Sequence, residues 1–191
     1  MIWNLPNTLT WLRILAVPLI VALFYMPYPW ADPAAGLLFT AAAITESLDG
    51  YLARRMGQTS RLGAFLDPVA DKLIVAVSLI LLVSKPPPVG SDPRWIIVLS
   101  ACVIIGREIA ISALREWMAE IGQRTKVAVS QLGKYKTIIQ MVGIPMMLYR
   151  WPLWGIDVYR LGLWLTVAAA ILTLSSMVSY LRAAWPALSS R

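Results

Sequence analysis

The sequence predicts an all-α integral membrane protein with six transmembrane helices and a polar cavity open to the cytoplasmic side. The 191 residues are 59% hydrophobic and 14% charged, with a mean hydropathy of +0.68. Soluble domains average about 45–50% apolar and about 25% charged residues. Apolar runs recur along the chain, and ionisable residues gather at one end of most of them. No polar stretch is long enough for a soluble unit, so residues 1–191 are expected to form a single membrane-embedded domain.

The composition also limits the chemistry. The net charge is +7, but apolar runs separate the basic residues, so no nucleic-acid partner is expected. Cys102 is the sole cysteine, which excludes an intrachain disulfide. The chain has no histidine, which excludes histidine-dependent triads and histidine-ligated zinc. Any metal ion must be held by oxygen ligands, and these favour Mg²⁺ or Mn²⁺.

Two segments satisfy the length criterion for a membrane span directly, because a transmembrane helix needs roughly 20 mainly apolar residues. They are residues 14–31 and 161–181, and neither contains a charged side chain. A cleaved signal peptide is the alternative for residues 1–30, but this segment lacks a basic start and a convincing small-residue cleavage site.

Four shorter apolar runs lie between these two segments, at residues 34–45, 73–84, 95–106 and 138–149. Each provides about a dozen uncharged residues, or roughly 18 Å of helix, so each span must extend through neighbouring ionisable residues. Loops are expected at Pro27/Pro29, at Pro86-Pro87-Pro88 with Gly90, and at Trp151-Pro152. Four middle helices that are polar at one end predict a polar cavity within the bundle.

The basic residues indicate the orientation of the bundle, because cytoplasmic loops are enriched in Lys and Arg. With the N-terminus in the cytoplasm, 13 of the 17 Lys and Arg residues fall on the cytoplasmic side. The ionisable helix ends fall on the same side. We therefore expect a multi-pass protein with both termini in the cytoplasm.

Four carboxylates flank a short basic loop between the second and third helices. Glu46 and Asp49 share a helix face, and Asp67 and Asp71 share a face of the next helix. Two unit charges about 5 Å apart at an effective dielectric constant near 20 repel by roughly 3 kcal/mol. Such a cluster requires protonation or bound cations, and we interpret it as a site for divalent ions, with two ions sharing ligands.

Small and basic residues lie between these acids. Gly50, Ala53 and Gly63 leave room for a flat or bulky ligand, and Arg54 adds a positive charge suited to a diphosphate. Two other interpretations stay open: a structural network of acids with neighbouring Arg and Lys side chains, and a proton-relay site. A small cation or proton transporter would carry its carboxylates near the membrane midplane within inverted repeats, and no repeat is visible in the sequence.

A second group of basic residues follows at the same predicted depth. Arg107 and Arg115 are about 80° apart around a helix, and Glu108 is expected to hold the Arg115 guanidinium in place. Lys134 and Lys136 begin the next helix, and an Arg and Lys cluster suits a dianionic phosphate. The alternative for such residues is snorkelling to anionic headgroups.

The first segment carries polar residues that allow two interpretations. Asn7, Thr10 and Arg13 either line a nucleotide pocket or cap an interfacial helix.

The acidic segment resembles the signature of a known family. The string Glu46-x2-Asp49-Gly50-x2-Ala53-Arg54-x8-Gly63-x3-Asp67-x3-Asp71 is similar to the CDP-alcohol phosphotransferase motif D-x2-D-G-x2-A-R-x8-G-x3-D-x3-D. Seven of the eight fixed positions match, and Glu46 stands where the family has Asp. Residues 4–14, 63–73, 107–122 and 133–140 extend the resemblance over nearly the whole chain.

The resemblance implies a phosphatidyl transfer from CDP-diacylglycerol to sn-glycerol 3-phosphate, giving phosphatidylglycerophosphate and CMP. It further implies a homodimer in the bacterial cytoplasmic (inner) membrane, and two divalent ions, Mg²⁺ or Mn²⁺, that bridge the CDP diphosphate. A relative with another acceptor, such as serine or inositol phosphate, shares the signature and remains an alternative.

The implied roles fall on particular residues of this chain. The metal ligands are Glu46, Asp49, Asp67 and Asp71, with Asp71 also the catalytic base for the incoming alcohol. The CDP-binding residues are Gly50, Ala53, Arg54, Gly63, Asn7 and Thr10, and the glycerol-phosphate-binding residues are Arg107, Arg115, Lys134 and Lys136.

Overall fold

The computed structural model describes the backbone of residues 5–56, 61–88, 90, 92–122 and 131–189. It describes the side chains of the same residues, with the exception of 5–7, 47–56, 61–62, 64, 131–134, 183 and 186–189. The described chain forms six α-helices: α1 (Leu5–Tyr25), α2 (Ala31–Met56), α3 (Arg61–Ser84), α4 (Trp95–Glu120), α5 (Gln131–Tyr149) and α6 (Val158–Ser189). The prediction of an all-α chain is confirmed.

The helix boundaries correct one expectation. The segment 14–31 is not a single helix, because α1 begins at Leu5 and ends at Tyr25, and α2 already begins at Ala31. Proline cannot continue a helix without losing a backbone hydrogen bond, and Pro27 and Pro29 lie in this break. The other two predicted breaks are also confirmed, because α3 ends at Ser84 before Trp95 begins α4, and α5 ends at Tyr149 before Val158 begins α6.

Three helices of the described chain are long and apolar enough to cross a membrane by themselves: α1, α4 and α6, with windows at Thr8–Tyr25, Trp95–Glu120 and Val158–Arg182. Helix α4 meets the criterion although its uncharged run, 95–106, is short. A membrane protein therefore fits the structure.

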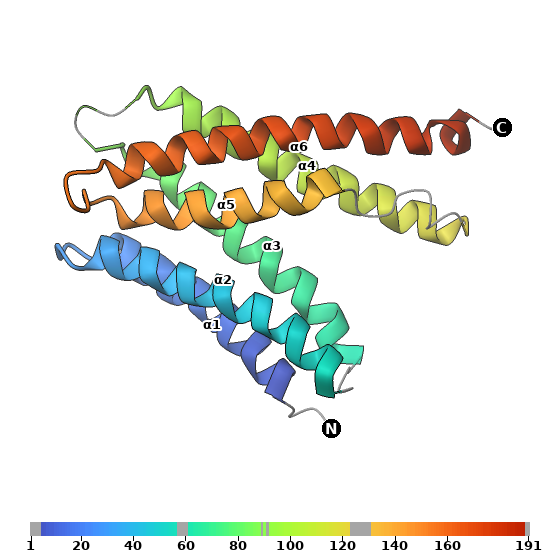
Figure 1. Ribbon diagram of the computed structural model, residues 1–191, viewed down its shortest axis with the longest axis horizontal. Helices are drawn as coiled ribbons and strands as arrows, with labels where there is room; N and C mark the ends of the chain where they lie inside the picture. The colour runs from blue at the N-terminus through green and yellow to red at the C-terminus, as the bar shows by residue number, and fades with distance from the viewer. Residues whose placement is uncertain (1–4, 57–60, 89, 91, 123–130, 190–191) are drawn as a thin grey trace.

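The helices run alternately up and down the bundle, as Figure 1 shows. The links α1–α2, α3–α4 and α5–α6 lie at one end, and the start of α1 and the end of α6 lie at the other. Helix α5 packs against both α2 and α6, α1 packs against α2 and α3, and α4 packs against α6. At the end that holds the termini, α1–α3 diverge from α4–α6 (Figure 1).

The apolar core ties the two groups of helices together. Its fully buried side chains include Ile20, Phe24, Phe39, Leu79, Leu82, Ile97, Ile144, Met147 and Tyr159. Large apolar side chains also face outward along the helices, among them Leu19, Leu37, Ile80, Leu99, Ile109 and Ile171. An outer surface of this kind suits a lipid environment, in which backbone groups are satisfied within each helix.

Two glycines let α5 and α6 approach closely. A Cβ on Gly162 would lie 2.6 Å from the Gly143 carbonyl oxygen, and one on Gly143 would lie 2.7 Å from Thr166 Oγ1. Gly36 allows a similar close approach of α2 and α5, because a Cβ on Gly36 would lie 2.8 Å from the Pro145 carbonyl oxygen. Small residues at helix contacts are typical of membrane bundles, and here they fix the position of α5 between α2 and α6.

Candidate functional site

A cavity of about 290 Å³ lies between α2, α3, α4 and α5. Its lining residues are Glu46, Asp67, Pro68, Asp71, Lys72, Val75, Glu108, Thr137, Gln140 and Met141. Four helices that are separate in sequence thus contribute to one polar space. Glu46 of α2 and Asp67 and Asp71 of α3 line the same space as Glu108 of α4, which belongs to the second predicted group.

We call Glu46, Asp67 and Asp71, with the expected Asp49, the acidic site. Glu46 and Asp71 are close enough to share a side-chain hydrogen bond, and the charge of Asp67 acts on Asp71. Glu46, Asp67 and Asp71 line the same cavity, and the convergence of Asp49 with them stays a prediction. Two carboxyl groups close enough to share a hydrogen bond require a proton or a cation between them.

Helix α1 supplies partners for two of these acids. Thr10 Oγ1 donates a hydrogen bond to Asp67 Oδ1 at 2.5 Å, and Arg13 forms an ion pair with Asp71 Oδ1. Thr10 and Arg13 are both buried, with 1% and 2% of their surface exposed. Thr10 and Arg13, for which the sequence left two interpretations, therefore face the acids of α3.

Several predicted site residues lie outside the described side chains. Asp49, Gly50, Ala53 and Arg54 are on the described backbone of α2, and Asn7 and Lys134 are on those of α1 and α5. Gly63 is described and buried at the start of α3. The roles assigned to these residues stay predictions.

The donor chemistry of the acidic site fits a hard divalent cation, because all three described side chains offer carboxylate oxygen, which Mg²⁺ prefers. Among the described residues, no group of three acidic or cysteine side chains is arranged to hold a metal ion by itself. The predicted fourth ligand, Asp49, is one helical turn from Glu46 and outside the described side chains. The described residues thus supply part of the expected ligand set.

Basic side chains from α4 and α5 form the second group, which we call the cationic cluster: Arg107, Arg115 and Lys136 with Glu108. Arg107 Nη1 and Lys136 Nζ both donate to Glu108 Oε1, each at 2.8 Å. The Arg107 and Lys136 side chains are 6% and 5% exposed, and that of Glu108 is 30% exposed. Arg107 Nη2 also donates to Ser176 Oγ of α6 at 3.3 Å.

The predicted pairing of Glu108 with Arg115 is wrong. Arg115 Nη2 instead donates to Tyr180 Oη at 3.0 Å. Seven residues of helix separate Glu108 from Arg115 by about 10 Å along the axis, whereas Lys136 approaches Glu108 from another helix. Proximity between helices therefore outweighs a shared face on one helix.

Tyr180 is a residue of the cluster that sequence reasoning missed. The guanidinium carbons of Arg107 and Arg115 lie 5.5 Å and 5.2 Å from the centre of its ring, close enough for cation–π attraction. A single tyrosine near the end of a long apolar helix carries no signal of this role, because its partners are on α4.

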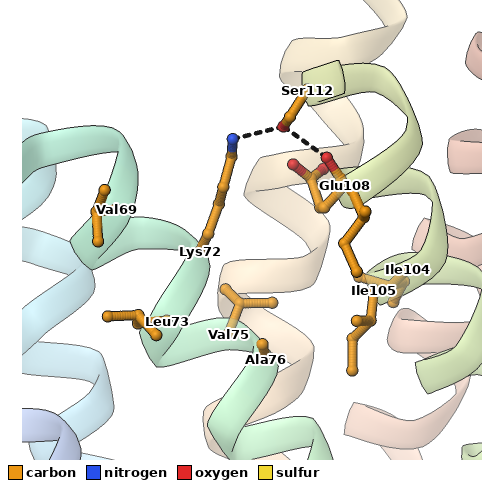
Figure 2. Close-up of a pocket in the computed structure, with 10 residues that line it drawn as sticks. Val69, Lys72, Leu73, Val75, Ala76, Ile104, Ile105, Glu108 and Ser112 are labelled. Atoms are coloured by element: carbon orange, nitrogen blue, oxygen red, sulfur yellow. Dashed lines mark hydrogen bonds between the residues drawn. The ribbon is translucent and has the colours of Figure 1, made fainter. Parts of the chain in front are cut away.

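An apolar groove of about 430 Å³ continues from the polar cavity between α3 and α4. Lys72, Val75 and Glu108 line both spaces. Figure 2 shows Lys72 pointing across the mouth of the groove to Ser112, with Nζ 2.5 Å from Ser112 Oγ. Below this bridge, the walls carry aliphatic side chains such as Ile104 and Ile105 (Figure 2).

Comparison with known proteins identifies the family. Residues 3–181 match the family described as CDP-alcohol phosphatidyltransferase. The chain belongs to this family. The resemblance predicted from the acidic motif is thereby confirmed.

Curated relatives cover nearly the whole chain. Proteins of Salmonella choleraesuis (strain SC-B67) and Escherichia coli (strain K12) are each 47% identical to it over 182 residues, which is 95% of this chain and 95% of the relative. Both are named CDP-diacylglycerol–glycerol-3-phosphate 3-phosphatidyltransferase. A Shigella flexneri protein of the same name is similar to the same extent.

Proposed function

We propose that the protein transfers the phosphatidyl group of CDP-diacylglycerol to sn-glycerol 3-phosphate, giving phosphatidylglycerophosphate and CMP in phospholipid biosynthesis. The family leaves the acceptor open, and the names of the relatives favour glycerol phosphate. The observation that carries the proposal is the single cavity lined by Glu46, Asp67, Asp71 and Glu108, which places an acidic site next to a cationic cluster.

The acidic site is the proposed place of the leaving nucleotide. Glu46, Asp49, Asp67 and Asp71 would hold two divalent cations, Mg²⁺ or Mn²⁺. When bound, these ions neutralise the diphosphate and stabilise the departing CMP. The residues proposed to bind the CDP group are Asn7, Thr10, Gly50, Ala53, Arg54 and Gly63.

Asp71 is the proposed base. Its carboxylate accepts the proton of the acceptor hydroxyl as that oxygen forms a bond to the phosphorus next to the diacylglycerol. The bond from this phosphorus to the CMP oxygen breaks at the same centre, and the electron pair leaves with CMP. Asp71 lines the cavity, as this role requires.

The cationic cluster is the proposed site for the acceptor phosphate, formed by Arg107, Arg115, Lys134 and Lys136. Its described members carry three positive charges against the one negative charge of Glu108. An excess of cations, of which Arg107 and Lys136 are buried, suits a dianionic phosphate and gives no comparable reason to bind serine.

The proposed setting is the bacterial cytoplasmic (inner) membrane, with all six helices spanning it, both termini and the cavity on the cytoplasmic side, and two copies forming a homodimer. In spheroplasts of a Cys102→Ser background, an impermeant thiol reagent should then label Trp154→Cys and spare Arg182→Cys. Both positions are exposed, at opposite ends of α6 and its preceding loop. Labelling of Arg182→Cys alone would indicate the opposite orientation of the chain in the membrane.

A direct test of the activity uses the purified protein in detergent with radiolabelled CDP-diacylglycerol, Mg²⁺ and separate acceptors. With sn-glycerol 3-phosphate, label should move to phosphatidylglycerophosphate and CMP should be released. Transfer to serine or inositol phosphate instead would overturn the acceptor. Ion flux across vesicles without any lipid product would favour the transporter alternative.

A further inference from the structure

Two residues of α1 and two of α3 form a ladder of matching contacts. Thr10 and Arg13 are three residues apart on α1, and Asp67 and Asp71 are four apart on α3, so each pair shares one face of its helix. Thr10 contacts Asp67 and Arg13 contacts Asp71 in the same order along the chain. A single chance contact between helices would not have this register.

The burial of Arg13 makes the ladder costly to break. Its side chain is 1% exposed, whereas that of Asp71 is 30% exposed and lines the cavity. A buried guanidinium requires a paired carboxylate, since an uncompensated charge in such a place is strongly unfavourable. Arg13 therefore has a strong preference for one position of Asp71, while the acid retains access to the cavity.

Both contacts use the same kind of atom. Thr10 and Arg13 each bond to the Oδ1 oxygen of their acid. A carboxylate has two oxygens, and an ion-binding carboxylate is normally held in orientation by a hydrogen bond to one of them. Each acid therefore has an oxygen bonded to α1, while Asp67 and Asp71 both line the cavity.

We propose that α1 is the positioning element of the acidic site: Thr10 and Arg13 hold the carboxylates of Asp67 and Asp71 in the orientation that would bind a divalent cation. This inference rests on the proposed function, which places the cation there. Arg13 is a positioning residue, because it acts through Asp71. Thr10 has this role toward Asp67 in addition to its proposed place in the CDP pocket.

The sharpest test changes Thr10, because it carries no charge. In Thr10→Val the hydroxyl is lost at nearly constant shape, and in Thr10→Ser it is retained. The binding of Mn²⁺ alone to the purified full-length protein is followed by electron paramagnetic resonance. Thr10→Val should bind Mn²⁺ roughly tenfold more weakly, as loss of an outer hydrogen bond to a ligand does, and Thr10→Ser should bind it nearly as well as the wild type.

Thr40→Val is the matched control. The Thr40 hydroxyl donates to the Gly36 carbonyl oxygen of its own helix at 2.8 Å, and the residue is exposed. Mn²⁺ binding should be unchanged in this variant. Thermal unfolding of every variant separates a lost contact from a lost fold.

Arg13 gives a second, independent test. Removal of its positive charge in Arg13→Gln would by simple electrostatics strengthen cation binding. The positioning role predicts the opposite: Mn²⁺ binding and kcat fall together, the KM for CDP-diacylglycerol changes little, and Arg13→Lys restores part of both. Arg160→Gln is the control, because its ion pair with Asp92 is exposed and lies away from the acidic site.

The outcomes separate this inference from the proposed function. Wild-type levels of Mn²⁺ binding in Thr10→Val, or tighter binding in Arg13→Gln, would overturn the positioning role. Phosphatidyl transfer by the wild-type protein would still support the proposed function in that case. Absence of both Mn²⁺ binding and phosphatidyl transfer in the folded wild type would overturn the proposed function and the inference with it.

Discussion

Replacing Glu108 with glutamine removes the negative charge of the cationic cluster and so tests what that charge contributes. The amide keeps an acceptor oxygen of similar shape, but Arg107 and Lys136 lose the anion that both contact at 2.8 Å. Both cations are almost fully buried, so water cannot replace the missing charge. We expect the fold to be less stable and the binding of an external anion to become stronger.

The size of the effect follows from burial. Removal of one partner from a buried ion pair costs about 3–5 kcal/mol. Glu108 itself is 30% exposed, and solvent screening reduces the expected loss to about 2–3 kcal/mol. For a chain of this length, that corresponds to a fall in Tm of roughly 4–12 °C. The measurement is thermal unfolding in detergent, followed by intrinsic fluorescence.

Addition of the acceptor provides the decisive comparison. A ligand present at about one hundred times its Kd stabilises the folded state by about 2.7 kcal/mol. sn-Glycerol 3-phosphate should therefore raise the Tm of Glu108→Gln by more than that of the wild type, and glycerol should not. Glu116→Gln, an exposed site on the same helix, should behave as the wild type. Equal Tm values for Glu108→Gln and wild type, or no response of the variant to glycerol phosphate, would refute the reasoning.

Three further predictions test the site and the fold. Asp71→Asn should keep CDP-diacylglycerol binding in an equilibrium assay and lose turnover; near-normal turnover would remove its role as base. Glu46→Asp, which restores the family residue, should preserve or raise Mg²⁺-dependent transfer, and a large loss would indicate a pocket adapted to glutamate. Gly162→Ala would place a Cβ 2.6 Å from the Gly143 carbonyl oxygen and should lower stability by about 1–3 kcal/mol. Gly106→Ala, whose Cβ meets nothing within 4 Å, should not lower it in the same unfolding assay.

Local rules predicted much of the helical layout. Clustered proline and glycine disfavour a continuing helix, and the breaks near Pro27, Pro86 and Pro152 fall as expected. Single prolines do not end these helices, since Pro18, Pro68 and Pro145 lie inside α1, α3 and α5. The apolar run 14–31 nevertheless misjudged the extent of the first helix, which is Leu5–Tyr25, because residues 26–30 are apolar and aromatic although they lie between α1 and α2. Composition alone does not distinguish such a turn from a continuing membrane helix.

Contacts between helices were the part that the sequence could not supply. The spacing of Asp67 and Asp71 is a property of one helix, so it could be predicted, whereas their contacts with Thr10 and Arg13 depend on how α1 packs against α3. The same limit explains why Glu108 pairs with Lys136 and not with Arg115.

In this bundle, the helices that lack a long apolar run are also the helices that line most of the polar cavity. Helices α2, α3 and α5 do not meet the criterion for an independent span, and nine of the ten residues that line the polar cavity come from these three helices. Ionisable side chains inside a membrane are costly and are retained where they serve a function. The close contacts of Gly36 and Gly143 then attach α5 to α2 and α6, which are both longer than α5. Packing of this kind lets the helices that line the cavity depend less on their own hydropathy for their place in the membrane. The least apolar helices can therefore carry the candidate catalytic residues.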